Sequence, residues 1–150
     1  MSRRLARELA FQVLFQVDIG HVPWKVALTR SIEENQLPEK SNDFLEKLVS
    51  GTMTNLTQID EVLSKFSVGW SLNRMTNTDR NILRLAIYEL LNLGDVPVEV
   101  SVNEAVELAK VYGEAESGRF VNGVLGNLIR EISTALNAKE PPLPVQGDDR

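Results

Sequence analysis

The 150-residue sequence contains no cysteine and only one histidine, and aromatic residues make up 6% of it. Without cysteine it can form no disulfide framework, thiolate metal site or cysteine nucleophile. His21 lies two residues before Pro23 and is expected to be an exposed loop residue. One such histidine offers too little for a Ser-His-Asp triad or a two-histidine metal site. We therefore expect no catalytic residues, no metal site and no cofactor, and we expect that the protein is not an enzyme.

Long apolar runs are also missing. No run approaches the ~20 residues that a membrane-spanning helix needs. The N-terminal sequence Met-Ser-Arg-Arg lacks the uninterrupted apolar stretch of a signal peptide. The sequence therefore predicts a cytoplasmic protein with no membrane contact.

The chain has an excess of negative charge, but that charge is unevenly distributed. It carries 16 basic and 21 acidic residues, a formal net charge of -5. Such a balance argues against nucleic-acid binding when it is taken alone. The first ten residues, however, hold three arginines and one glutamate, a net of +2, which leaves -7 for the remainder. A basic arm on an acidic body can still bind nucleic acid locally.

Helical periodicity runs through almost the whole sequence, and no stretch shows the alternation of a half-buried strand. Thr76–Asp79 and Ser101–Glu104 both match the capping box that starts many helices. We expect six helices, over residues 3–18, 23–35, 41–66, 76–93, 101–113 and 117–137. In the 67–75 linker, Trp70 and Leu72 are expected to fill the junction between the two halves.

These helices predict an all-α fold of two stacked three-helix subdomains. The N-terminal half covers about residues 1–66 and the C-terminal half covers 67–137, within a single domain of residues 1–137. Residues 138–150 contain three prolines and two terminal aspartates, which offer little to bury. They are predicted to form a disordered tail.

The first helix has a polar and aromatic side outside its apolar stripe. On a helical wheel, Ala6, Leu9, Ala10, Val13, Leu14 and Val17 form the stripe. The remaining positions of interest are Arg3, Arg4, Arg7, Glu8, Phe11, Gln12 and Phe15. Two interpretations of the phenylalanines stay open. They pack against a second neighbouring element, or they form, with the arginines, a surface for single-stranded RNA or a protein.

Four segments together resemble one known family. They are RRLARELAFQ at residues 3–12, DRNILRLAIYEL at 79–90, VSVNEAVELAKVYG at 100–113 and RFVNGVL at 119–125. In order and spacing they are similar to the bacterial transcription antitermination factor NusB, over about residues 2–130. The resemblance implies an all-helical fold of two three-helix subdomains.

The resemblance also implies a function in transcription antitermination. Members of the family bind the boxA element of ribosomal RNA transcripts together with NusE, a small-subunit ribosomal protein, and join the elongating RNA polymerase complex. The residues implied in RNA binding are Arg3, Arg4, Arg7 and Gln12 in the first helix, and Glu116, Arg119 and Phe120 in the last. The residues implied at the NusE interface are Phe15, Asp79, Arg80 and Arg84. Some members dimerise, and exposed Phe11 and Phe15 would suit a homodimer here.

Two alternatives are kept open. The first is the NusB-like domain that precedes the catalytic domain of some ribosomal RNA methyltransferases. That interpretation needs a following catalytic domain, whereas this sequence has no glycine-rich cofactor motif after a strand. The second is a helical protein adaptor without RNA contact, which the acidic total charge would favour.

Overall fold

The computed structural model describes the backbone of residues 3–139 and the side chains of residues 3–133. Within this range the chain forms seven α-helices and one short 3-10 helix, with no strand. They are α1 (Arg3–Gly20), α2 (Trp24–Asn35), α3 (Glu39–Thr54), α4 (Leu56–Phe66), η1 (Leu72–Arg74), α5 (Asn77–Asn92), α6 (Val98–Tyr112) and α7 (Ser117–Lys139). The all-α prediction is confirmed. Residues 140–150 of the predicted tail lie outside the described residues. No described helix has the length and apolar character to cross a membrane.

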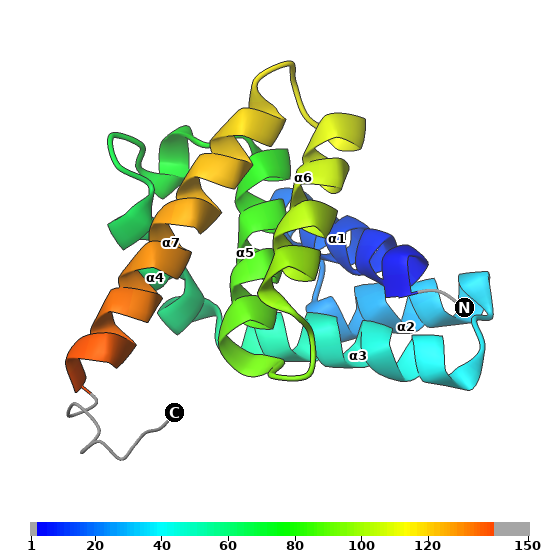
Figure 1. Ribbon diagram of the computed structural model, residues 1–150. Coiled ribbons are helices and arrows are strands. Elements are labelled where there is room, and N and C mark those ends of the chain that lie inside the picture. The colour runs from blue at the N-terminus through cyan, green and yellow to red at the C-terminus, as the bar shows by residue number, and fades with distance from the viewer. Residues whose placement is uncertain (1–2, 140–150) are drawn as a thin grey trace, which may run out of the picture.

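Helix α5 lies at the centre of the molecule. It packs against α1, α3, α4, α6 and α7, which surround it (Figure 1). Helices α1, α2 and α3 also pack against one another. Buried residues occupy almost every position of α5 from Asn81 to Glu89, as expected for a helix that is surrounded by others. The two helical groups are therefore stacked through a shared central helix.

The prediction of a single helix over residues 41–66 is wrong, because the helix is interrupted at Asn55. This residue has φ -113° and ψ 20°, between α3 and α4. Its side-chain amide donates a hydrogen bond of 2.8 Å to the carbonyl oxygen of Gly51. The same carbonyl also accepts the backbone N–H of Asn55 at 3.2 Å, so both groups of Asn55 close the end of α3. The break redirects the chain so that α4 packs against α5 and α7.

Gly51 allows α3 to approach α5 closely. A Cβ atom at this position would lie 2.1 Å from Cζ of Tyr88, inside the space that the aromatic ring occupies. The ring of Tyr88 is buried against α3 as a result. A glycine is therefore needed here for packing.

One predicted helix start is confirmed and the other is wrong. Thr76 caps α5, and its Oγ1 accepts a hydrogen bond of 3.0 Å from the backbone N–H of Asp79. Ser101 does not cap α6, which begins at Val98 directly after Pro97. The hydroxyl of Ser101 instead donates to the buried carboxylate of Glu89 at 2.8 Å. The capping-box pattern at 101–104 therefore serves a tertiary contact.

Candidate functional site

The first turn of α1 presents two exposed arginines. The guanidinium of Arg3 lies over the ring of Phe44, 4.4 Å from its centroid, and 3.5 Å from Asp95. Arg4 is 71% exposed and forms two hydrogen bonds with the carboxylate of Glu104 in α6, of 3.1 and 2.8 Å. Both cations lie at the surface, as the sequence predicts.

Arg7 is buried, and its predicted place outside the core is wrong. Its side chain is 5% exposed, and that of its partner Glu89 is 2% exposed. The Nε and Nη2 atoms of Arg7 donate to the two carboxylate oxygens of Glu89 at 2.8 and 3.0 Å. The physical reason is that α1 packs against both α3 and α5, so that its buried face is wider than one stripe. The pair joins α1 to the central helix.

Phe11 is also buried, at 3% exposure. Its ring packs against Tyr112, with centroids 5.0 Å apart, and against Phe15 at 6.0 Å. The first of the two open interpretations, packing against a second element, therefore holds for Phe11. Phe15 is only partly buried and still reaches the surface. The argument for a homodimer from two exposed phenylalanines fails for Phe11.

Gln12 takes part in a hydrogen-bond network between α1 and α6. Its amide donates a hydrogen bond of 2.9 Å to the hydroxyl of Tyr112, which in turn donates to the carboxylate of Glu8. The bond to Glu8 raises the pKa of Tyr112, and burial adds to the effect. The amide of Gln12 is therefore already engaged within the chain.

The first turn of α7 presents the second group of predicted site residues. Ser117 accepts a hydrogen bond of 2.9 Å from the backbone N–H of Glu114, which fixes the start of the helix. Arg119 and Glu116 are both exposed and lie 3.5 Å apart. Phe120 is partly buried and meets Trp70 edge to face, with centroids 5.8 Å apart.

Trp70 is an aromatic surface residue that sequence reasoning assigned to the interior. Its side chain is half exposed, so the expectation that it fills the junction between the halves is wrong. Leu72 does pack against the core. The sequence signal that could have identified Trp70 is the glycine before it, since Gly69 adopts φ 83° and turns the chain at the surface.

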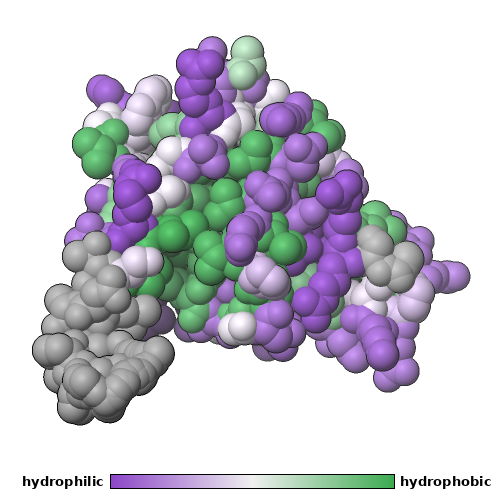
Figure 2. Space-filling view, in the orientation of Figure 1, coloured by the Kyte–Doolittle hydropathy of each residue, from purple (hydrophilic) through white to green (hydrophobic). Residues whose placement is uncertain are grey.

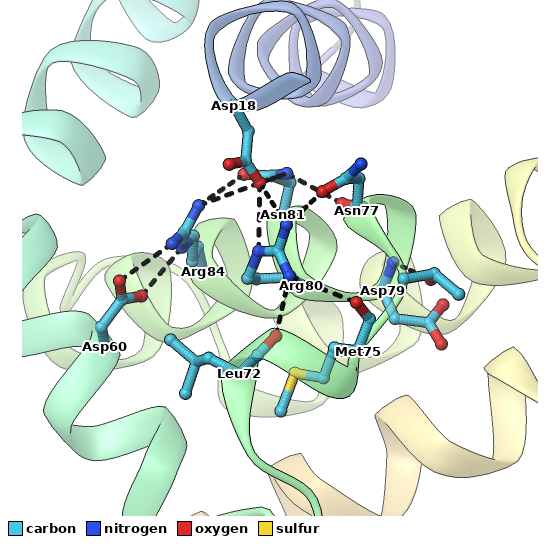
Figure 3. A network of polar contacts seen from close by, with 10 residues as sticks. Asp18, Asp60, Leu72, Met75, Asn77, Asp79, Arg80, Asn81 and Arg84 are labelled. Atoms are coloured by element: carbon cyan, nitrogen blue, oxygen red, sulfur yellow. Dashed lines mark hydrogen bonds and ion pairs between the residues drawn. The ribbon is translucent and has the colours of Figure 1, made fainter. Parts of the chain in front are cut away.

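Arg80 and Arg84 are committed to contacts within the chain (Figure 3). Arg80 donates to Asp18 at 2.9 and 3.0 Å and to the carbonyl oxygen of Leu72 at 2.7 Å. Arg84 pairs with Asp60 through two hydrogen bonds, of 2.8 and 2.9 Å. The two side chains are only 13% and 12% exposed. They tie α5 to α1, to α4 and to the segment before α5.

Asp18 is the shared acceptor of this network. Burial alone would raise the pKa of its carboxyl group. The hydrogen bonds from Asn81 and Arg80 and the charges of Arg80 and Arg84 outweigh burial, and together they hold the pKa below its ordinary value. The Asp18 carboxylate is therefore stabilised in its charged form at the end of α1.

Asp79 differs from its two arginine neighbours, because its Oδ1 atom is buried without a hydrogen-bond partner. Burial, together with the nearby charge of Glu114, raises the pKa of its carboxyl group and outweighs the hydrogen bonds from Ser117 and Thr76, which lower it. Asp79 lines a cavity of about 170 Å³, together with Trp70, Met75 and Phe120. Of the predicted partner-interface residues on α5, it is the one with unused acceptor capacity.

Hydrophobic residues also gather in the middle of one face. Figure 2 shows them between α7 and α6, with hydrophilic residues around them. Exposed large hydrophobic residues near the turn from α5 to α6 include Leu91, Val98 and Val100. Within the residues that the structure describes, no group of three or more histidine, aspartate or glutamate residues could hold a metal ion. The described surface therefore presents cationic side chains, aromatic rings and apolar area to a binding partner.

Comparison with known proteins identifies the family. A sequence profile of the NusB family matches residues 4–130. The transcription antitermination protein NusB of Desulfitobacterium hafniense is 50% identical over 135 residues, which cover 89% of this chain and 91% of that protein. The solved structure of T. maritima NusB matches with a TM-score of 0.83 at 39% identity, over 87% of this chain and 92% of that one. A chain in the structure described as antitermination factors NusB and NusE in complex with dsRNA matches with a TM-score of 0.79 at 28% identity, over 87% of this chain and 99% of that one. The chain therefore belongs to the NusB family.

Proposed function

We propose that this protein is a transcription antitermination factor that binds boxA RNA of ribosomal RNA transcripts together with NusE. The observation that carries the proposal is the similarity, over nearly the whole fold, to a chain in a structure with NusE and double-stranded RNA. The names of relatives that are about half identical support it. The complex of RNA and two proteins would then join the elongating RNA polymerase in the cytoplasm.

The RNA surface that we propose has its cations at two helix starts. Arg3 and Arg4 supply positive charge from α1, and Arg119 supplies it from α7. Their exposure supports contact with phosphates. Phe120, which follows Arg119 in α7, supplies a ring for stacking on a base. Glu116 would lie at the rim of this surface, and Gln12 would face RNA only if its amide leaves the hydroxyl of Tyr112.

Arg7 has a different role in this proposal. Because its guanidinium is buried and doubly bonded to Glu89, it holds the α1 helix that carries Arg3 and Arg4. The sequence alone offers at most five arginines for phosphate contacts, namely Arg3, Arg4, Arg7, Arg80 and Arg119, and the burial of Arg7 removes one of them. Arg80 is also unavailable to phosphates, since its guanidinium is bonded to Asp18.

The partner surface that we propose centres on Phe15 and Asp79. The partial exposure of Phe15 supports contact with a second protein, and Asp79 lies at the start of α5 with one carboxylate oxygen buried and unpartnered. Arg80 and Arg84 support this surface indirectly, because their ion pairs hold α5 in place. A NusE molecule bound here would raise RNA affinity through added contacts and thermodynamic linkage. The protein acts by binding, and the proposal includes no chemical turnover.

The decisive experiment is a mobility-shift assay on boxA RNA and on scrambled RNA, with and without NusE, at two salt concentrations. We expect tighter binding to boxA RNA when NusE is present, and weaker binding at higher salt. Equal affinity for the two RNAs under all four conditions would overturn the proposal.

A triple substitution separates the RNA-binding function from that of a protein adaptor. Arg3→Ala, Arg4→Ala and Arg119→Ala together should weaken boxA binding in the presence of NusE. The matched control removes three exposed cations from α2 and α4, as Lys25→Ala, Arg30→Ala and Lys65→Ala. If both triple variants bind boxA RNA as tightly as the wild-type chain, the RNA surface lies elsewhere, whereas absence of RNA binding by the wild-type chain itself would favour the adaptor function.

A further inference from the structure

Each exposed arginine of the proposed RNA surface has a carboxylate partner, but one pair differs from the other two. Arg3 lies 3.5 Å from Asp95, and Arg119 lies 3.5 Å from Glu116, with all four side chains largely exposed. Glu104, in contrast, is only 15% exposed and accepts two hydrogen bonds from Arg4. A two-point bond to a carboxylate held within the structure is stronger than a single exposed contact.

We propose that Glu104 is a positioning residue that sets the RNA affinity by occupying the phosphate-binding edge of Arg4. This inference rests on the proposed function. A guanidinium binds phosphate best through two parallel N–H groups. The Nε and Nη2 atoms of Arg4, which would form such an edge, both donate to Glu104. RNA must displace Glu104 from that edge or accept hydrogen bonds from Nη1 and the second hydrogen of Nη2, at the end of the guanidinium.

Glu104 can hold this position because α6 fixes it. The helix begins at Val98, so Glu104 lies in its second turn and has no capping role. The carboxylate raises the pKa of Arg4, first through the hydrogen bond and then through its charge. Glu104 therefore stabilises a charged but engaged guanidinium.

Both ways of binding RNA carry a cost from the same carboxylate. If phosphate takes the Nε–Nη2 edge, Glu104 loses its partner while it stays partly buried. If phosphate takes Nη1, two negative groups lie across one guanidinium and repel each other. Arg4 thus contributes less to RNA binding than a free surface arginine would.

The test compares two substitutions that each remove one negative charge from α6. Glu104→Gln releases the edge of Arg4. Glu107→Gln is the matched control, because Glu107 is exposed, pairs with Lys110 and acts on Arg4 only through its charge. We expect Glu104→Gln to tighten binding to boxA RNA up to about fivefold, the range of an exposed ion pair. Its log-log salt slope should steepen by about 0.7, the value for one more phosphate contact on single-stranded RNA. Glu107→Gln should change both quantities less.

Arg4 provides the second arm of the test. In the Arg4→Ala background, Glu104→Gln should no longer raise affinity beyond the effect of Glu107→Gln. Arg4→Lys keeps the charge but cannot form the two-point bond, so it should bind boxA RNA at least as tightly as the wild-type chain. This variant remains informative if Glu104→Gln fails to fold, which its melting curve would show.

Three results would overturn the inference while the proposed function stands. They are equal effects of Glu104→Gln and Glu107→Gln, persistence of the gain in Arg4→Ala, and a loss of affinity in Arg4→Lys. If the wild-type chain fails to bind boxA RNA even with NusE, the proposed function itself is wrong.

Discussion

Substitution of Arg7 should lower the free energy of unfolding without removing an RNA contact. In Arg7→Ala the carboxylate of Glu89 stays buried, with the hydroxyl of Ser101 as its remaining partner in the network. Breaking a buried ion pair by deleting one partner costs about 3–5 kcal/mol. Because both side chains are almost fully buried, solvent screening does not reduce this value. For a chain of this length each kcal/mol lowers the Tm by about 2–4 °C, so the Tm should fall by roughly 6–20 °C.

The assay is urea and thermal unfolding followed by circular dichroism at 222 nm, with RNA binding measured at a temperature where each variant is folded. The matched control replaces both partners, as Arg7→Met with Glu89→Leu, and should recover most of the lost free energy of unfolding. Arg119→Ala should show the reverse pattern, an unchanged Tm and weaker RNA binding. A free energy of unfolding within about 1 kcal/mol of wild type would refute the argument. A tenfold loss of RNA affinity in folded Arg7→Ala would also refute it, because it would place Arg7 in contact with RNA.

Three further predictions concern packing, pH and salt. Gly51→Ala places a methyl group inside the ring of Tyr88 and should cost about 1–3 kcal/mol in urea unfolding, whereas Gly94→Ala, which meets nothing within 4 Å, should not. The pKa of Asp18 lies below its ordinary value of 3.8, so its contribution to stability is present above that pH and is lost as the pH falls through the lowered value. Melting curves between about pH 2 and 6 should show this loss, and Asp18→Asn should remove it. With three exposed arginines instead of five, the salt slope of RNA binding should be no steeper than about -2; a slope near -3.5 would show that buried arginines are released.

Features that depend on neighbouring residues could be predicted from the sequence. The apolar stripe of α1, the cap of Thr76 on α5 and the surface position of Arg119 all follow from three- and four-residue spacing. The four segments that carry the family resemblance lie on α1, α5, α6 and α7, three of which pack directly against the central α5. The fold class could therefore be predicted from the sequence alone.

Features that depend on distant residues could not be predicted. Arg7 and Glu89 are 82 residues apart, and Arg4 and Glu104 are 100 residues apart. A helical wheel treats α1 as having one buried face, whereas the folded helix has neighbours on several sides. The sequence motif at Glu104 has a local explanation, a capping box, that hides its tertiary partner. The same limit applies to the break at Asn55, which directs α4 against the distant helices α5 and α7.

The distance in sequence between Arg7 and Glu89 also has a consequence for the time course of synthesis. Helices α1 and α3 bury their faces against α5, so the first 66 residues cannot complete their core before α5 has been made. A ribosome that adds about 5–20 residues per second needs roughly 4–16 s to travel from Arg7 to Glu89. During that interval Arg7 is without its partner, and the ring of Phe11 lacks Tyr112 of α6, which is made later still. The nascent N-terminal segment is thus exposed to proteases and chaperones throughout this interval. The exposure ends only when α5 has left the ribosome and the segment can fold against it.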